Sequence, residues 1–180
     1  MTNLYRTVRD GRFLRNFHLE KSLFTREECN FMVAYFKSTT YAQAGVVDND
    51  NSVGNDIKSI QMNDVRKGHL VYIDSSNKLF ANVFRKLYYC LTMVNFGWNV
   101  LPLQFLQLTE YDSTTDGGFY KRHRDIIVDQ NPQRIISVVT QLSPSDSYTG
   151  CELKFDEGVG MPNCNEFKEQ GDTVYFLSDE

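Results

Sequence analysis

The chain has 180 residues, of which 41% are hydrophobic and 23% charged, a composition typical of one globular domain with a buried core. Its 19 Lys and Arg stand against 23 Asp and Glu, and the net charge of −4 disfavours nucleic acid as a partner. No apolar run approaches the ~20 residues of a membrane span. Charges also interrupt the N-terminal segment, so we expect a cytoplasmic protein that has no signal peptide and does not enter a membrane.

The cysteines are too widely spaced for a zinc knuckle or for the C-x-x-C site of a thioredoxin. They are Cys29, Cys90, Cys151 and Cys164. We therefore expect free, mostly buried thiols in a reducing cytoplasm.

The first predicted helix spans about residues 25–38. Thr25 and Glu28 have the spacing of a capping box, and Phe24 stands where a hydrophobic staple begins. Apolar residues at helical spacing then form one stripe: Cys29, Met32, Val33 and Phe36. This pattern predicts an amphipathic helix with one face in the core.

A second helix is predicted from about residue 76 to 95, after the N-cap candidates Asp74, Ser75 and Ser76 and before Gly97. Its apolar stripe is Phe80, Val83, Leu87, Cys90, Leu91 and Val94. The polar stretch 46–59 between the helices does not match a calcium-binding loop, and we interpret it as a loop, with a substrate lid as the alternative.

From residue 103 onward the pattern changes to short, β-rich runs separated by glycine and proline. The predicted strands are 103–111, 134–142, 151–155 and 172–177. Such strands indicate a sandwich, barrel or jelly roll. We therefore predict one α+β domain over residues 1–180, with 1–100 as mainly helical support and 101–180 as the β core.

The chemistry-bearing residues concentrate in the segment 110–125. His123 and Asp125 form an H-x-D pair, and on a strand residues i and i+2 point to the same face. An imidazole and a carboxylate can then meet at one cation, as two members of the 2-His-1-carboxylate set of non-haem iron. The alternative is a solvated charge cluster with the neighbouring Lys and Arg side chains.

Several motifs follow in a fixed order around this pair. A strand ends at Tyr111, and a glycine-rich turn, F-Y-x-x-H-x-D, R-I-I-S-V-V-T-Q-L, Y-T-G-C-E-L and G-D-T-V-Y-F-L come after it. This order resembles the prolyl 4-hydroxylase type of iron(II)/2-oxoglutarate-dependent dioxygenase, closely over residues 103–180 and loosely over 22–98. The resemblance implies a double-stranded β-helix, that is, a cupin-like jelly roll.

The resemblance also implies roles for single residues. His123 and Asp125 match iron ligands, Tyr120 matches a tyrosine near iron and substrate, and Tyr111 matches a tyrosine that hydrogen-bonds the co-substrate. Arg134 matches an arginine near the substrate groove. From the residues alone, the alternative is that both tyrosines are aromatic residues that pack at the rim of the sandwich and that Arg134 is a charge at a strand edge.

The side chain of Gln141 lies on one predicted strand face with Ser137 and Val139, where it is able to reach a co-substrate carboxylate.

The sequence departs from the family pattern at two places. Cys151 stands at the second glycine of the family motif, and we expect strain there if that glycine has a positive φ. The family places its second iron-binding histidine, and then the arginine for the distal carboxylate of 2-oxoglutarate, beyond Glu180. The other histidines, His18 and His69, precede the expected strand. We expect that these 180 residues lack the tail of a normal enzyme and are inactive without it, the alternative being a chain that naturally ends here.

The resemblance implies an enzyme that uses iron(II), 2-oxoglutarate and molecular oxygen, with ascorbate as reductant. It hydroxylates an unactivated C–H bond, here predicted to be in a prolyl residue of a peptide or protein, and releases succinate and CO2. The alternatives are a non-catalytic jelly-roll binding module and, third, a nucleic-acid demethylase. The sequence does not predict an oligomeric state.

Overall fold

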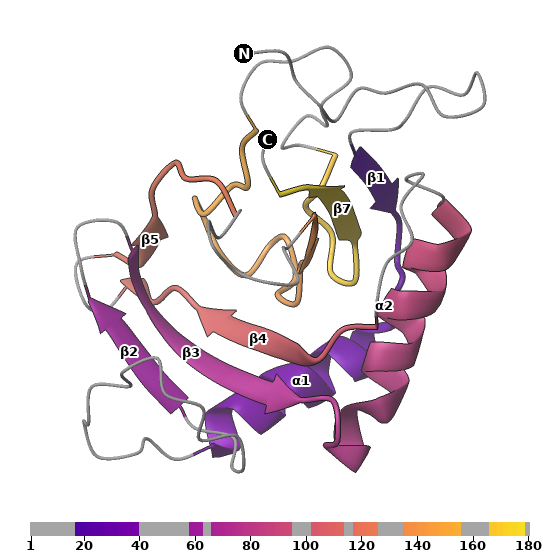
Figure 1. Cartoon of the computed structure of the whole chain (residues 1–180). Helices are drawn as coiled ribbons and strands as arrows, with labels where there is room; N and C mark the ends of the chain where they lie inside the picture. The colour runs from indigo at the N-terminus through magenta and orange to yellow at the C-terminus, as the bar shows by residue number, and fades with distance from the viewer. Residues whose placement is uncertain are drawn as a thin grey trace.

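The structure is a computed structural model that describes residues 17–39, 58–62, 66–94, 102–113, 117–125, 135–155 and 166–178 (Figure 1). These residues form two antiparallel β-sheets and two α-helices. The predicted α+β class is therefore confirmed. No helix among these residues is both long and apolar enough to cross a membrane.

The smaller sheet has the strand order β1(Phe17–Glu20), β7(Thr173–Leu177) and β6(Ile136–Thr140). All five residues of β7, the central strand, are buried. Hydroxyl pairs join β6 to the β7 segment, with Ser137 Oγ 2.9 Å from Ser178 Oγ and Thr140 Oγ1 2.9 Å from Thr173 Oγ1. Buried hydroxyls with partners at this distance avoid the cost of unsatisfied polar groups.

The larger sheet has the order β2(Lys58–Met62), β3(Arg66–Asp74) and β4(Phe105–Glu110). The two-residue strand β5(Phe119–Tyr120) pairs with the start of β3, so that Tyr120 lies opposite Arg66. Figure 1 shows this sheet curving across the molecule, with β5 at one end of it. The long strand β3 therefore links the core to the segment that carries the H-x-D pair.

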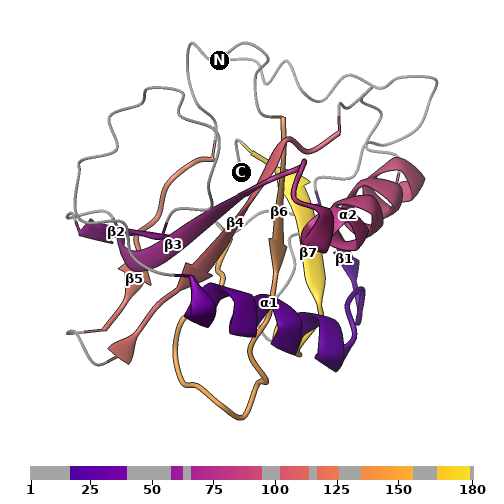
Figure 2. The same cartoon turned by 90° about the horizontal axis from the view of Figure 1, so that it is seen from below.

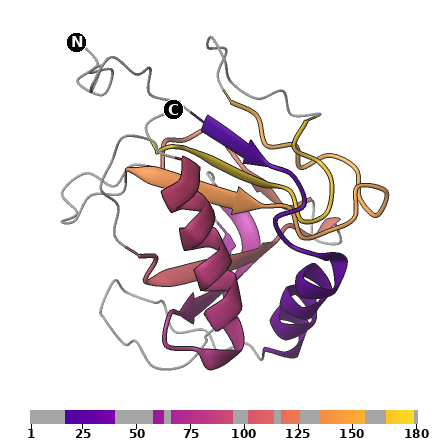
Figure 3. The same ribbon diagram turned by 90° about the vertical axis from the view of Figure 1, so that its right-hand side faces the viewer.

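Two helices cover the sheets. Helix α1(Arg26–Ser38) begins with the predicted capping box, in which the Thr25 hydroxyl accepts from the Glu28 N–H and the Glu28 carboxylate accepts from the Thr25 N–H. Helix α2(Ala81–Val94) follows a short 3₁₀ helix, η1(Lys78–Phe80), and runs across β6 in the view of Figure 3. Helix α1 runs crosswise to β6 and β7 in Figure 2.

The main hydrophobic core lies between these helices and both sheets. Its fully buried members include Phe24, Cys29, Val71, Ile73, Phe80 and Tyr175. Burial of each large side chain contributes roughly 1.5–3 kcal/mol. The core therefore joins α1, α2, β3 and β7 into one packed unit.

A tight turn before β7 connects that strand to the start of α1. Gly171 has φ +90°, and a Cβ there would lie 2.0 Å from the Phe24 carbonyl oxygen. Asp172, only 1% exposed, accepts hydrogen bonds from Lys21 Nζ at 2.7 Å and from the Ser22 N–H at 3.1 Å. The G-D pair of the sequence motif therefore holds the β1–α1 turn against β7.

The elements with strong local patterns agree with the sequence predictions. Both helices are confirmed. Asn77, and not Asp74, Ser75 or Ser76, is the N-cap, and it caps η1, the 3₁₀ turn that precedes α2. Three predicted strands correspond to β4, β6 and β7. Gly97 and residues 46–57 lie outside the described residues, and Lys58 and Ser59, the end of the predicted loop, belong to β2.

Three strands were missed in the sequence, and one predicted strand is absent. Strands β1, β2 and β3 lie within residues 1–100, beside the two predicted helices. Residues 151–155 form no strand. The reason lies at their start, where Gly150 and Cys151 have φ of +78° and +56° and leave the extended conformation.

The thiols follow the expectation in part. Cys29 and Cys90 are free and buried, and burial raises the pKa of Cys29 to about 11. Cys151 is also free but exposed. Its φ is positive, the conformation that we considered because the family motif has a glycine at this position. Cys164 lies outside the described residues.

Candidate functional site

The H-x-D pair comes together directly after β5. His123 Nε2 lies 3.0 Å from Asp125 Oδ1, and the two side chains are 30% and 23% exposed. Residues 121–125 are not a strand, so the premise of a shared strand face is wrong. An irregular path after Tyr120 brings the two groups together instead, and they face each other at the surface.

The hydrogen bonds of His123 determine what can lie between the two groups. His123 Nδ1 lies 2.6 Å from the Lys121 carbonyl oxygen, which only accepts, so Nδ1 carries a proton. In a neutral imidazole the lone pair of Nε2 then faces the Asp125 carboxylate. The arrangement therefore suits a shared proton or a cation between Nε2 and Oδ1.

Tyr120 covers the imidazole from the strand. Its ring stacks on the His123 ring with centroids 3.5 Å apart and planes 16° apart. The guanidinium carbon of Arg66, opposite Tyr120 in the β3–β5 register, lies 4.5 Å from the Tyr120 ring centroid. A cation at this distance is attracted to an aromatic face, so these contacts hold β5 and His123 to the end of β3.

Tyr111 lies beside the same group at the end of β4. The Arg66 guanidinium carbon is 6.0 Å from its ring centroid. Two glycines allow the close packing, since a Cβ on Gly118 would lie 2.6 Å from Tyr111 Cα and one on Gly68 would lie 3.1 Å from the Tyr111 ring. The predicted glycine-rich turn therefore has a physical requirement for Gly118.

The electrostatics of Tyr111 connect it to a further element. Burial raises the pKa of the Tyr111 phenol, and the charge of Arg66 partly offsets this effect. Cys151 acts electrostatically on the pKa of Tyr111 and also on that of Tyr148, whose pKa is raised mainly by burial. The Y-T-G-C-E-L turn therefore lies close enough to act on the tyrosine.

The remaining predicted site residues are not joined to this group by a described contact. The Gln141 amide donates to the Ser143 carbonyl oxygen at 3.3 Å, and its backbone bonds to Gly171 and Asp172 at the end of β6. Gln141 follows β6 of the smaller sheet, whereas His123 follows β5 of the larger one. Arg134 lies outside the described residues.

The His123–Asp125 pair offers two donor atoms to a metal ion. Imidazole nitrogen and carboxylate oxygen are ligand types of non-haem iron, and the Nδ1–H bond to Lys121 orients Nε2 as a ligand. Within the described part of the chain, no third His, Cys, Asp or Glu joins them closely enough to share one ion. These residues fit two positions of an iron site.

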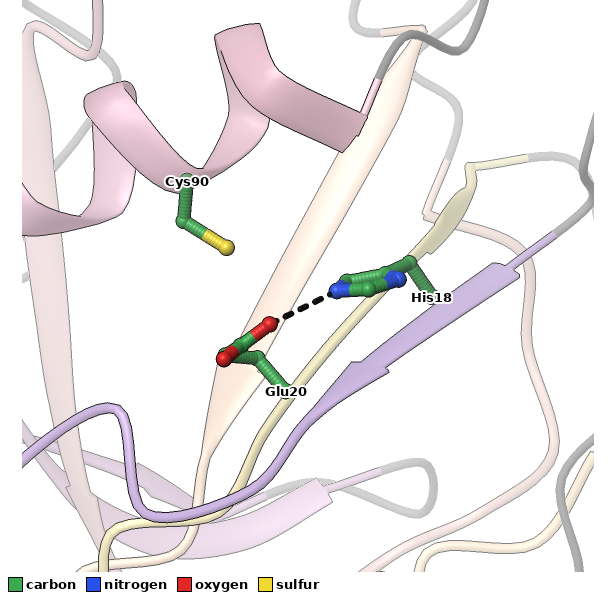
Figure 4. A group of neighbouring side chains, drawn as sticks. All are labelled: His18, Glu20 and Cys90. Carbon is green, nitrogen blue, oxygen red and sulfur yellow. Dashed lines mark hydrogen bonds and ion pairs between the residues drawn. The ribbon is translucent and has the colours of Figure 1, made fainter.

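Sequence reasoning missed Arg66 because it missed β3. The run of β-branched and aromatic residues at 70–73 is a strand signal, but the pairing of Arg66 with Tyr120 depends on the register of two distant segments. The three-donor cluster of His18, Glu20 and Cys90 was also missed, because it depends on the contact between two distant segments, β1 and α2 (Figure 4).

No protein-family model matches this sequence, and neither the curated proteins nor the solved structures include a significant match.

Proposed function

We propose that this protein is an iron(II)- and 2-oxoglutarate-dependent dioxygenase that hydroxylates a prolyl residue in a peptide or protein. Molecular oxygen is the oxidant and ascorbate the reductant that maintains iron(II). The observation that carries the proposal is the His123–Asp125 pair, with Nε2 and Oδ1 3.0 Å apart and Nδ1 bonded to Lys121. We also propose a double-stranded β-helix fold, compatible with two antiparallel sheets, and a cytoplasmic location.

The chain's own residues have separable roles in this proposal. His123 and Asp125 hold iron(II), which when bound supplies the redox chemistry that couples decarboxylation of 2-oxoglutarate to C–H hydroxylation. Tyr120 restricts the rotation of the imidazole by stacking on it. Tyr111, packed against Gly118 and beside Arg66, presents a phenol to the co-substrate.

The charge around the pair supports an anionic co-substrate. The segment after β5 carries Lys121, Arg122 and Arg124, and Arg66 lies against Tyr120. 2-Oxoglutarate is a dianion, and positive side chains attract it to the site over the distance of a Debye length, about 8–10 Å. The same segment offers no comparable attraction for a cationic substrate.

The proposal is tested by measuring succinate formation from 2-oxoglutarate by the natively expressed protein, with iron(II), ascorbate and a proline-rich peptide. We expect that His123→Gln lowers the rate to below about 1% of wild type, because loss of a metal ligand weakens a site at least as much as loss of an outer partner. The matched control is His69→Gln, because His69 also pairs with a carboxylate, its Nδ1 lying 3.3 Å from Glu110 Oε2. Succinate formation that persists in His123→Gln contradicts the proposal.

The alternative, a non-catalytic binding module, is favoured by the presence of only two donors among the described residues around His123. A binding module retains the proline-rich peptide without forming succinate, and its peptide affinity is unchanged by added iron(II). Iron-dependent succinate formation excludes it.

A further inference from the structure

A second group of side chains of metal-ligand type lies between β1 and α2, on other elements than the H-x-D pair. His18 and Glu20 alternate along β1 and therefore share one face of the strand. Cys90 reaches the same place from α2 (Figure 4). One donor atom from each of the three lies within 4.8 Å of the others, and His18 Nε2 is 3.0 Å from Glu20 Oε2.

These distances suit a tetrahedral ion. Zinc bonds of about 2.0–2.3 Å to nitrogen, oxygen and sulfur place neighbouring ligands about 3.4–3.6 Å apart. The His18 Nε2–Glu20 Oε2 pair, at 3.0 Å, is shorter than this range and must open slightly, and any pair of donor atoms longer than about 3.6 Å, within the 4.8 Å bound of the cluster, must close. Torsions of the Glu20 and Cys90 side chains change these distances.

The cluster combines a buried thiol with a solvent-accessible carboxylate. Cys90 is 8% exposed, whereas the Glu20 side chain is partly exposed and pairs with His18. Metal binding displaces the thiol proton, and the charge of a divalent cation then balances the thiolate and the carboxylate.

The cluster lies against a buried aromatic residue, and it is open to solvent on the side of Glu20. Tyr175, 1% exposed, has its ring centroid 6.3 Å from that of His18 and donates its phenol to the Leu87 carbonyl oxygen at 3.1 Å. The Glu20 side chain is 43% exposed. An ion can therefore enter from the Glu20 side and retain a water ligand in the fourth position.

We propose that His18, Glu20 and Cys90 bind one zinc-type divalent ion and thereby link the edge strand β1 to helix α2. Thiolate, imidazole and carboxylate together select a borderline-soft ion, whereas magnesium and calcium prefer oxygen ligands alone. In the described part of the chain β1 pairs with β7 on one edge only, so the ion supplies a second attachment. This site does not depend on the proposed dioxygenase activity.

Cobalt(II) titration of the reduced chain tests the proposal, in a His123→Gln background that removes the other pair. We expect one equivalent to bind with a sulfur-to-cobalt charge-transfer absorption, and zinc(II) to displace it. Cys90→Ser abolishes the absorption, whereas Cys29→Ser, which changes another buried thiol of the core, leaves it unchanged. Binding without the sulfur absorption, or an absorption that persists in Cys90→Ser, overturns the proposal.

Glu20→Gln provides a variant that does not disturb the core, because Glu20 is a half-exposed residue of an edge strand. We expect it to weaken cobalt binding by about tenfold or more, since a carboxylate ligand becomes a neutral amide. Unchanged affinity in a Glu20→Gln chain with wild-type circular dichroism shows that His18 and Glu20 form only an ion pair and overturns the proposed site.

Discussion

Strands β7 and β5 differ in burial more than any other two strands whose side chains are described. All five residues of β7 are buried and lie at the centre of a sheet, whereas Phe119 and Tyr120 of β5 are 36% and 41% exposed. The turn before β7 contacts the segment between β1 and α1, whereas the segment after β5 carries the His123–Asp125 pair. Stability and candidate chemistry therefore depend on different regions, and substitutions can separate them.

The largest loss of stability is expected for Gly171→Ala. A Cβ there lies 2.0 Å from the Phe24 carbonyl oxygen at φ +90°, and the cost of positive φ, about 1–2 kcal/mol, adds to an overpacking cost of about 1–3 kcal/mol. We expect the free energy of unfolding in urea to fall by about 2–5 kcal/mol.

Gly150→Ala is the control for the backbone conformation alone. Its φ is +78°, and nothing lies within 4 Å of the added Cβ. We expect a loss of about 1–2 kcal/mol in the same unfolding experiment. Equal losses in Gly150→Ala and Gly171→Ala mean that the contact with Phe24 is unimportant, which contradicts the close packing of the turn before β7.

A smaller loss is expected for Asp172→Asn. The amide keeps an acceptor for the Ser22 N–H but presents an N–H to the Lys21 ammonium group in a site that is 1% exposed. We expect the free energy of unfolding to fall by about 1–3 kcal/mol. Glu169→Gln changes an exposed carboxylate that accepts from Ser145, and we expect at most about 0.5 kcal/mol. A larger effect at Glu169 than at Asp172 contradicts this view of the turn.

The same contrast explains which parts of the fold the sequence predicts. Helix α1 follows from a local capping box and an apolar stripe, and β7 from a continuous buried run. Strand β5 has two residues and forms because Arg66 and Lys67 of β3 pair with it. No local sequence pattern predicts this pairing. Strand β1, with the residues F-H-L-E, becomes a strand by pairing with β7.

The candidate sites differ in the same way. His123 and Asp125 are two residues apart, so the sequence predicts that their side chains meet, although the assumed strand is wrong. In the cluster of His18, Glu20 and Cys90, the first two residues have the same i, i+2 spacing, but Cys90 lies far from them in the chain and no sequence pattern joins it to them. Its assembly depends on how α2 packs on the sheet, which periodicity alone does not specify.

The smallest change in stability and the most direct test belong to His123→Gln. We would measure anaerobic iron(II) binding to the natural chain by equilibrium dialysis, with urea unfolding of the same samples. Because His123 is a surface residue after β5, we expect the free energy of unfolding to change by at most about 0.5 kcal/mol while one equivalent of bound iron(II) is lost relative to wild type. Equal iron binding by both chains, or a loss of iron that accompanies unfolding of the variant, contradicts the assignment of the metal pair to this exposed segment.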